Sequence, residues 1–582
     1  MPKLKPTELL HAEDLLSKGE SKEALKIITS FEGTVWRYYL EGDFEKGIED
    51  LLHCKELYEK ISGINPIYAN NLVTLSRFYA QKGEKNEGIM YAKKSLEIYE
   101  QLNDQAGIAR SYSLLAYNYG FNINSNPDLA IDYAERSLSI AEIDSMTKAD
   151  NLKNLSLIYS TQGRMDKAFQ FAEEGYKFAQ EKKNYIILAL CSLLIGNYYS
   201  LKGDFDRSLE YFKISLIHSK KAGFLELIGW AQFSLIRMYI RLDSHEQAQE
   251  YLKQLEDVAK RAKDKTTSKL YLTAKGLMFK ASGRSRDRAE AEKLFKQVVA
   301  DEITNPLVYL NAVSYLCDFL LEELEMSNNS EIINELEPLI TSLLKYAEKT
   351  HSLIYISLTK GFQAKLALIQ MEFEESRHLL TQAQRIAEQH GLQGFAKMFS
   401  TDHDKLLEQL NTWEQLKKDN APMSERIKFA SFDKIITRMK GMNVSETPDI
   451  LDEEPILLLI MDNSGATYFN HPFIENWDYS DLFSSFMSAF NTFSDEIFSK
   501  SIDRIRIGEN TILINPIEPF LACYVIKGQS YPALQKLTRF TEAIRENLEI
   551  WQALNKSVKT SEMLELDKPA ALKTVINEIF TQ

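Results

Sequence analysis

Cysteine and histidine are scarce in this chain, which has four and nine of them among 582 residues. The cysteines show no CxxC spacing, so we expect reduced packing residues rather than a disulfide framework. The nearest approach to a metal-ligand cluster is Asp402-His403-Asp404, whose adjacent side chains would point in different directions on a helix. We expect this segment to be a solvated surface and predict no metal site. The cysteines are Cys54, Cys191, Cys317 and Cys523.

Long apolar runs are missing as well. The longest strongly apolar stretch, Ile456 to Met461, is far shorter than the ~20 residues that span a bilayer. The first residues are not followed by an apolar stretch that would resemble a signal peptide. The formal charge of −14 argues against nucleic acid as a partner. We therefore expect a cytoplasmic protein without membrane insertion.

Motifs of known catalytic sites are absent too. The sequence has no GxxxxGK[ST] loop, no HExxH, no GxSxG, and no Cys or His pair at nucleophile spacing. We predict no enzyme, no catalytic residue and no cofactor. A chain longer than the ~250 to 300 residues at which one core stops growing must instead be divided into domains or repeats.

A forty-residue period dominates the first part of the chain. Aromatic residues recur at this interval, a glycine follows four of them by four positions, and a small residue follows four of them by nine positions. Glycine suits a helix end with positive φ, and a small residue lets a second helix approach the first. The series is Tyr39, Tyr79, Tyr119, Tyr159, Tyr199, Tyr239, Phe279 and Phe319, and the glycines are Gly83, Gly163, Gly203 and Gly283.

This pattern resembles the tetratricopeptide repeat, with Ile195, Gly196, Tyr199, Gly203 and Ser208 matching it position by position. A unit longer than the usual ~34 residues is shared with the kinesin light chain and with bacterial peptide-sensing regulators. The resemblance covers roughly residues 34 to 394. It implies an α-solenoid of helical hairpins whose first helices line a concave, peptide-binding surface.

The groove residues follow from helix geometry. A side chain two positions before each buried Tyr points about 200° away from it, toward the concave side. With the positions one and two turns earlier, this gives a wall of amides, aromatics and cations, which favours an acidic or C-terminal peptide, although surface helices generally carry Arg and Lys. The candidate groove residues are Asn70, Arg77, Arg110, Tyr117, Lys153, Asn197, Trp230, Arg237 and Arg241.

After Pro455 the period changes from 3.6 to 2. Two strands around Asp462-Asn463-Ser464-Gly465 are followed by a helix with its apolar face from Leu482 to Ile497, then three strands, and a helix from near Ser530 to Trp551. We predict a five-stranded antiparallel sheet with helices on one face. Arg504 and Arg506 would share one side of the sheet, where they could receive an acidic partner or keep that side wet, and we expect the wet side.

The order of these elements resembles the longin and roadblock domains of the profilin-like architecture, with PAS and GAF domains as the alternatives. The resemblance implies a platform for small GTPases, their regulators or a like domain, including a homodimer. Our predicted division is therefore a mostly α chain with a solenoid at 1–410, a helical and acidic linker at 411–454, this α+β domain at 455–555 and a tail helix at 556–582.

Two functions from different classes follow. The first is a non-enzymatic adaptor or scaffold, in which the groove binds a partner peptide and the α+β domain docks a second protein such as a small GTPase. The second is a sensory regulator that binds a signalling peptide or a small ligand. A further hypothesis places the amphipathic tail, Leu564 to Phe580, in the groove of the solenoid.

Overall fold

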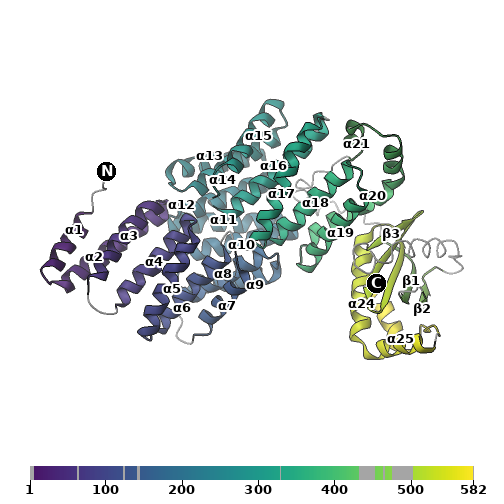
Figure 1. The fold of residues 1–582 in the computed structure, drawn as a ribbon, viewed down its shortest axis with the longest axis horizontal. Helices are drawn as coiled ribbons and strands as arrows, with labels where there is room; N and C mark the ends of the chain where they lie inside the picture. The colour runs from purple at the N-terminus through teal and green to yellow at the C-terminus, as the bar shows by residue number, and fades with distance from the viewer. Residues whose placement is uncertain are drawn as a thin grey trace.

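The computed structural model describes residues 6–61, 65–121, 125–140, 144–303, 305–327, 329–430, 453–462, 466–474, 503–560 and 562–580. Helical hairpins stack from the N-terminus onward, and a small α+β domain follows at the other end (Figure 1). The early helices are α1 (Thr7–Ser17), α2 (Ser21–Glu41), α3 (Phe44–Glu59), α4 (Pro66–Lys82), α5 (Lys85–Gln101), α6 (Gln105–Gly120), α7 (Pro127–Leu138), α8 (Ser145–Thr161), α9 (Met165–Glu181), α10 (Tyr185–Lys202) and α11 (Phe205–Ala222). The later ones are α12 (Leu225–Arg241), α13 (His245–Arg261), α14 (Lys265–Ser282), α15 (Ser285–Ala300), α16 (Pro306–Ser327), α17 (Glu331–Lys349), α18 (Leu353–Ile369), α19 (Phe373–Gln389), α20 (Gln393–Lys418) and α21 (Met423–Ala430).

The predicted register of the repeats is confirmed. Each aromatic residue of the period lies on the first helix of a hairpin, and Tyr199 stacks on Tyr211 of the second helix at a ring distance of 5.7 Å. Equivalent stacks recur in four other repeats: Tyr79 with Tyr91, Tyr119 with Tyr133, Tyr159 with Phe171 and Tyr239 with Tyr251. Stacked rings hold the two helices of a hairpin in a more defined relative position than contacts between aliphatic side chains would, because aromatic stacking is directional.

Small residues permit the close approach of the helices. A Cβ at Gly196 would lie 2.6 Å from the Phe212 ring, so only glycine leaves room for that ring. Ser208 donates a hydrogen bond to the Gly196 carbonyl across the same hairpin (2.9 Å). The predicted turn glycines do adopt positive φ, with Gly203 at 80° and Gly83 at 96°. Local geometry therefore fixes each hairpin before any distant contact forms.

Successive hairpins wind until the solenoid meets itself. Lys263 pairs with Asp43 (2.6 Å), and its amide donates to the Glu41 carbonyl (3.1 Å). These partners are 220 residues apart, or about five and a half repeats. A similar spacing, 224 residues, separates Ser125 from the Lys349 carbonyl that accepts its hydrogen bond. Hairpins far apart in the sequence therefore touch each other at these two places.

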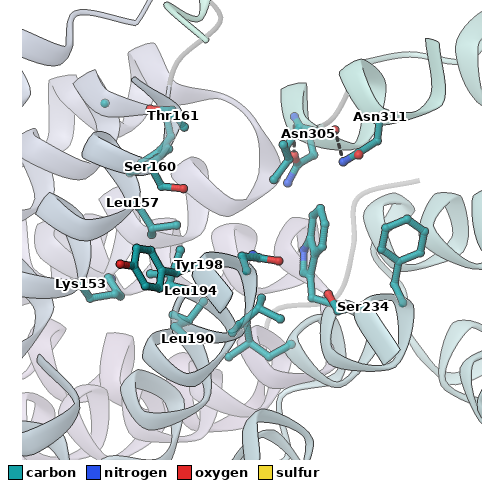
Figure 2. A pocket seen from close by; sticks show the side chains of 18 of the residues that line it. Lys153, Leu157, Ser160, Thr161, Leu190, Leu194, Tyr198, Ser234, Asn305 and Asn311 are labelled. Atoms are coloured by element: carbon teal, nitrogen blue, oxygen red, sulfur yellow. Dashed lines mark hydrogen bonds between the residues drawn. The ribbon is translucent and has the colours of Figure 1, made fainter. Parts of the chain in front are cut away.

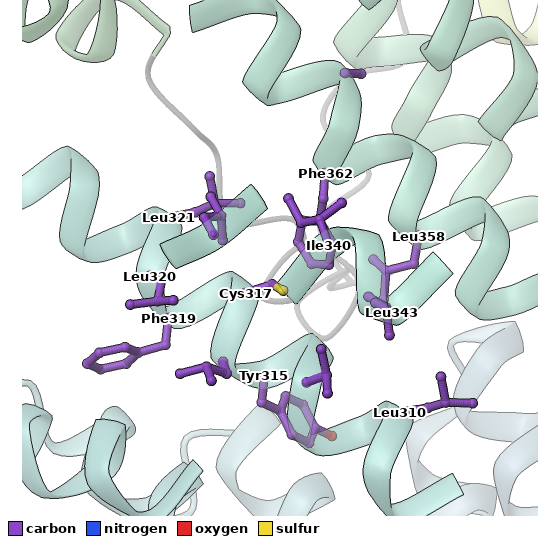
Figure 3. Close-up of a cluster of buried hydrophobic side chains, with 14 of the residues drawn as sticks. Leu310, Tyr315, Cys317, Phe319, Leu320, Leu321, Ile340, Leu343, Leu358 and Phe362 are labelled. Carbon is purple, nitrogen blue, oxygen red and sulfur yellow. The ribbon is translucent and has the colours of Figure 1, made fainter. Parts of the chain in front are cut away.

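The largest core lies in the later hairpins. Figure 3 shows Leu310 and Cys317 of α16, Leu343 of α17 and Phe362 of α18 converging in one apolar cluster. Burying side chains of this size contributes about 1.5–3 kcal/mol each. This core holds α16, α18 and α20 in place around the inner surface.

The C-terminal part contains the predicted five-stranded antiparallel sheet, in the order β2-β1-β5-β4-β3. Its helices pack on one face, where Leu458, Tyr524 and Phe540 share a buried cluster. The other face is also buried at Leu459 and Val525, as expected for a strand that is apolar throughout. The elements are β1 (Glu454–Asp462), β2 (Thr467–Pro472), β3 (Arg504–Ile507), β4 (Asn510–Ile517), β5 (Phe520–Lys527), α24 (Ser530–Glu546), α25 (Leu548–Thr560) and α26 (Ala570–Phe580).

Two predictions about the end of the chain are wrong. The helix expected to run from Ser530 to Trp551 breaks at Asn547, whose side chain accepts hydrogen bonds from the amides of Glu549 and Ile550 and so caps α25. The tail does not lie in the groove of the solenoid. Phe580 of α26 packs on Tyr524 and Phe540 of its own domain, because this sheet offers an apolar face next to the tail.

Several predicted features fall outside the described residues. They are the helix with its apolar face from Leu482 to Ile497, the Asn463-Ser464-Gly465 turn, and residues 431–452 of the linker. The predicted boundary at residue 410 lies within α20. The domain limits and the likeness to longin or roadblock domains remain predictions.

Candidate functional site

A cavity of about 1970 Å³ occupies the inside of the solenoid. Side chains from α4, α6, α8, α10 and α12 line it, and α16, α18 and α20 close the other side. Figure 2 shows Leu157 of α8, Leu190 of α10 and Asn311 of α16 around one part of this space. Pockets for small ligands measure about 300–1,000 Å³, so this cavity has room for a larger molecule.

All nine candidate groove residues line this one cavity. They come from five repeats and converge because each lies on the face of its first helix that points away from the helix partner. The residues are Asn70, Arg77, Arg110, Tyr117, Lys153, Asn197, Trp230, Arg237 and Arg241. Their role in holding a peptide stays a prediction.

The charge of the lining is opposite to that of the whole chain. Eleven lysines and arginines line the cavity against two acidic residues, Asp150 and Glu226, whereas the chain carries −14. Such a surface attracts an anion into the cavity. The cations are Arg77, Lys85, Arg110, Lys153, Lys182, Lys183, Lys202, Lys221, Arg237, Arg241 and Lys397.

Asp150 neutralises part of this charge. Its carboxylate pairs with Arg77 (3.1 Å) and with Lys153 (2.9 Å). Burial raises the pKa of Asp150, but the two cations outweigh burial and hold that pKa below its usual range. These ion pairs hold Arg77 and Lys153 in place and leave them less free to bind a ligand.

Lys85 and Glu226 give the cavity two groups that titrate near neutral pH. The Lys85 ammonium lies over the Tyr117 ring, 4.4 Å from its centroid. Both side chains are half-buried. The surrounding helices cover them on one side, and they face the cavity on the other. Burial lowers the pKa of Lys85 to about 7 and raises the pKa of Glu226 to about 8. The charge at this end of the cavity therefore depends on pH and on what binds there.

Arg237 and Arg241 stand one turn apart on α12. Arg241 lies 3.8 Å above the centre of the Phe205 ring, and Arg237 lies 5.6 Å from that of Phe233. No carboxylate in the described part of the chain pairs with either guanidinium. Stacking on aromatic rings holds the planar groups while leaving their N–H donors able to bind an anion.

Apolar side chains supply the rest of the wall. Leu190, Leu193 and Leu194 of α10 face Tyr355 and Phe395 across the lining of the cavity. Trp230 is half-buried and packs edge-on against Phe233, so these two aromatics serve the core as well as the cavity. A ligand with both apolar and anionic groups would find complementary surfaces here.

Sequence reasoning missed several lining residues. Lys85 opens the second helix of its hairpin, a position that the groove pattern of first helices does not include. Asn305 precedes α16 and accepts a hydrogen bond from the Leu307 amide (3.0 Å). Asn311 lies on α16, the helix that carries Phe319 of the forty-residue series, so this helix could have been included among the groove helices. Tyr355 lies on α18, beyond the end of that series.

The α+β domain is joined to the solenoid through Arg504, and the prediction of a wet sheet face is wrong there. The Arg504 side chain is fully buried and donates to Asp404 (2.8 Å), to Ser400 Oγ (2.9 Å) and to Gln384 (2.6 Å). It also pairs with the adjacent Asp503 (3.0 Å). Arg506, on the same side of the sheet, forms a more exposed pair with Glu408 (3.1 Å).

The expected surface segment Asp402-His403-Asp404 is likewise part of this junction. The His403 side chain is only 1% exposed, and burial together with Arg504 keeps its pKa well below the usual value. The pattern of adjacent polar residues suggested a solvated face, but α20 is covered on this side by β3 and α24.

Reactive and metal-binding groups are not gathered anywhere in the described ranges, where no group of three or more His, Cys, Asp or Glu is placed to hold an ion. The four cysteines are buried, and burial raises the pKa of each thiol. Of the described helices, α10 alone has the length and apolar composition to cross a membrane, with a mean hydropathy of 1.3. Half of that stretch is buried inside the solenoid.

Comparison with known proteins gives limited similarity. No protein-family model matches the chain. The transcriptional activator NprA of Geobacillus stearothermophilus is 24% identical over 228 residues, which are 38% of this chain and 53% of that protein. The chain therefore spans about half the length of this relative.

Solved structures with a similar arrangement include a Rap protein complexed with competence and sporulation factor, at 14% identity and a TM-score of 0.45, over 64% of this chain and all of the other. Another is the apo form of the quorum sensor NprR from B. thuringiensis, at 15% identity and a TM-score of 0.39, over 57% and 97% of the two chains. With TM-scores below 0.5, these similarities carry no functional argument.

Proposed function

We propose that this chain is a sensory regulator whose solenoid binds a short acidic peptide in its central cavity. The observation that carries the proposal is the cavity itself, about 1970 Å³ in volume, into which all nine candidate groove residues project. The name of the relative NprA, a transcriptional activator, supports a regulatory role. Of the two functions that the sequence suggests, the structure therefore favours the second.

A peptide suits the cavity better than a compact metabolite. Amide side chains can both donate to and accept from a peptide backbone, and Asn70, Asn197 and Asn311 present such groups from separate hairpins. Leucines and aromatics between them can cover apolar side chains of an extended peptide. The cavity volume of about 1970 Å³ exceeds the ~300–1,000 Å³ of pockets for small ligands and leaves room for a peptide.

The acidic character follows from the unpaired cations. Lys85, Arg237 and Arg241 have no carboxylate partner among the described residues, whereas Arg77 and Lys153 already share Asp150. Leaving such groups without an anion in a partly desolvated space is unfavourable. A peptide with acidic side chains or a free C-terminal carboxylate would relieve this cost.

Affinity selection with the full chain tests the proposal. We expect the wild type to retain acidic heptapeptides from a random library and to retain few basic ones, as read by mass spectrometry. Arg237→Glu should abolish the enrichment, whereas Arg136→Glu, on the exposed outer helix α7, should leave it unchanged. Failure to enrich any peptide, or equal enrichment by both variants, would refute peptide binding in this cavity.

A second candidate keeps the docking role of the α+β domain, for which the resemblance to longin and roadblock domains suggests a small GTPase or a like domain. One observation favours it: Leu548 of α25 is 69% exposed and Val558 is 42% exposed, and exposed apolar side chains can mark a protein contact. Capture of a purified nucleotide-loaded GTPase by the full chain, lost in Leu548→Asp, would support this candidate. Unchanged capture by the variant would exclude this surface.

A further inference from the structure

Two residues of the α+β domain reach the central cavity. Gln529 and Tyr531 line it together with Lys397, Met398 and Thr401 of α20. Tyr531 is only 9% exposed and joins the apolar core of the solenoid rather than that of its own domain. Its hydroxyl accepts a hydrogen bond from Gln535 (2.9 Å), which fixes the ring at the cavity wall.

Helix α20 faces the cavity on one side and the α+β domain on another. Lys397 and Thr401 are one turn apart and line the cavity, while Ser400 and Asp404, also one turn apart, bind Arg504. Because residues four apart lie on one helix face, the two stripes are about 60° apart around the axis. A shift of this helix would therefore alter the cavity and the junction at once.

Asp404 holds the segment that carries both cavity residues. One carboxylate oxygen pairs with Arg504 (2.8 Å), and the other accepts a hydrogen bond from the Ser530 amide (3.0 Å). Ser530 is the first residue of α24 and lies between Gln529 and Tyr531. A carboxylate at a helix N-terminus satisfies an amide that has no partner within the helix and interacts favourably with the helix dipole.

The junction is polar, which suits a contact that forms and opens. Arg504 is bound by three side chains of α19 and α20, and Arg377 donates to the Arg504 carbonyl (3.1 Å). Both ring nitrogens of His403 are buried without a hydrogen-bond partner, 3.8 Å separating Nδ1 from Asp503. Buried charged networks lose much of their Coulomb energy to desolvation, so such contacts contribute less stability than an apolar core of equal size.

We propose that Gln529 and Tyr531 are ligand-contacting residues of the cavity, so that ligand binding and docking of the α+β domain form one coupled equilibrium. The inference rests on the proposed function, since it assigns the same cavity. A ligand that touches these residues binds the docked state more tightly and thereby stabilises it. By linkage, docking strengthens ligand binding by the same factor by which the ligand strengthens docking.

The test measures docking and affinity separately on the full chain. Hydrogen exchange of the segment around Ser530 reports docking, because Asp404 protects that amide. We expect the acidic heptapeptide retained in the library experiment to slow this exchange. Asp404→Asn should speed it and lower the peptide affinity about 5- to 150-fold. Glu408→Gln, one turn further along α20 in the exposed pair with Arg506, should change the affinity less than twofold.

Other outcomes decide against the proposal. It is overturned if Asp404→Asn leaves the segment around Ser530 largely unprotected from exchange while the affinity stays constant, or if the bound peptide does not slow exchange. Tyr531→Ala should lower the affinity, and Tyr531→Phe should restore it if the ring makes the contact. Equal affinities for wild type and Tyr531→Ala would remove Tyr531 from the site.

A peptide-free arm separates this inference from the proposed function. If no peptide binds the wild type, a maleimide adduct on Thr401→Cys takes the place of the ligand, with the same adduct on Ser160→Cys as the control. Both positions line the cavity, but only Thr401 lies on α20. A change in exchange around Ser530 for the first adduct alone supports the coupling. No change, or the same change for both, contradicts it.

Discussion

The Arg504 guanidinium and the Asp404 carboxylate, one hundred residues apart in the chain, lie 2.8 Å from each other in a junction where Arg504 is fully buried and the Asp404 side chain is 17% exposed. Arg504 belongs to β3 of the α+β domain, and Asp404 belongs to α20, whose neighbouring face lines the central cavity. This contact is one of several that connect the domain to the wall of the proposed ligand site. Its strength and its dependence on pH are therefore open to measurement.

Removing Arg504 should destabilise the protein strongly. Arg504→Ala leaves Asp404 and Asp503 buried without their main partner, and breaking one side of a buried pair costs about 3–5 kcal/mol. Arg506→Ala removes the more exposed pair with Glu408 in the same interface and should cost no more than about 1 kcal/mol. The free energy of unfolding in urea measures both. Similar losses for the two variants would show that burial of Arg504 is not the cause.

Acid should weaken the junction. Burial alone raises the pKa of Asp503, but the positive charge of Arg504 outweighs burial and holds that pKa well below the usual range. For His403, burial keeps the pKa well below the usual value of a histidine. As the pH falls below about 6.5, the unfolded chain takes up a proton at His403 that the folded chain refuses; below about 3.9 the same holds for Asp503. Both effects lower stability with falling pH. Urea unfolding between pH 7.5 and 5 should show the first loss, and His403→Gln should reduce it.

Peptide binding should weaken as the pH rises from 6 to 9. Lys85, with a pKa of about 7, loses its positive charge over this range, and Glu226, with a pKa of about 8, gains a negative one. Both changes disfavour an anionic ligand, so binding should take up protons near pH 8. Calorimetric titration in buffers of different ionisation enthalpy measures this uptake. In the double variant Lys85→Met/Glu226→Gln the peptide affinity should hardly change with pH. If its pH profile is the same as that of the wild type, other groups take up the proton.

Glycine substitutions should separate the packing of a hairpin from helix propensity. Gly196→Ala places a Cβ 2.6 Å from the Phe212 ring, and overpacking of this kind costs about 1–3 kcal/mol. Gly33→Ala, on an open face of α2 with nothing within 4 Å, should stabilise by about 0.5–1 kcal/mol. Thermal unfolding measures the two shifts, which should have opposite signs.

Local spacing predicted the solenoid well. Tyr199, Gly203 and Ser208 occupy their expected places because a hairpin is decided by neighbours in sequence, and the same helix geometry placed all nine candidate residues at one cavity. The closure of the solenoid was beyond this reasoning. The contact between Lys263 and Asp43 depends on small rotations that accumulate over more than five hairpins.

The wrong predictions about the sheet face and the tail arise from tertiary contacts, in which another part of the chain covers the surface. The alternation of residues around Arg504 correctly predicts the side of the sheet on which its side chain lies. It does not predict that α19 and α20 cover that side. The apolar stripe of α26 is real, but its partner is the nearby sheet rather than the solenoid. The break at Asn547 had a readable signal, since Asn is a favoured N-cap and Glu549 follows within the first turn.

Photo-crosslinking of a bound acidic peptide tests the central claim most directly. A retained heptapeptide carrying a photoreactive group should label residues of the cavity wall, such as Leu190 of α10 and Tyr355 of α18, and excess unlabelled peptide should suppress the labelling. Labelling confined to the outer helices, or labelling that survives both competition and the Arg237→Glu substitution, would contradict the assignment of the cavity as the ligand site.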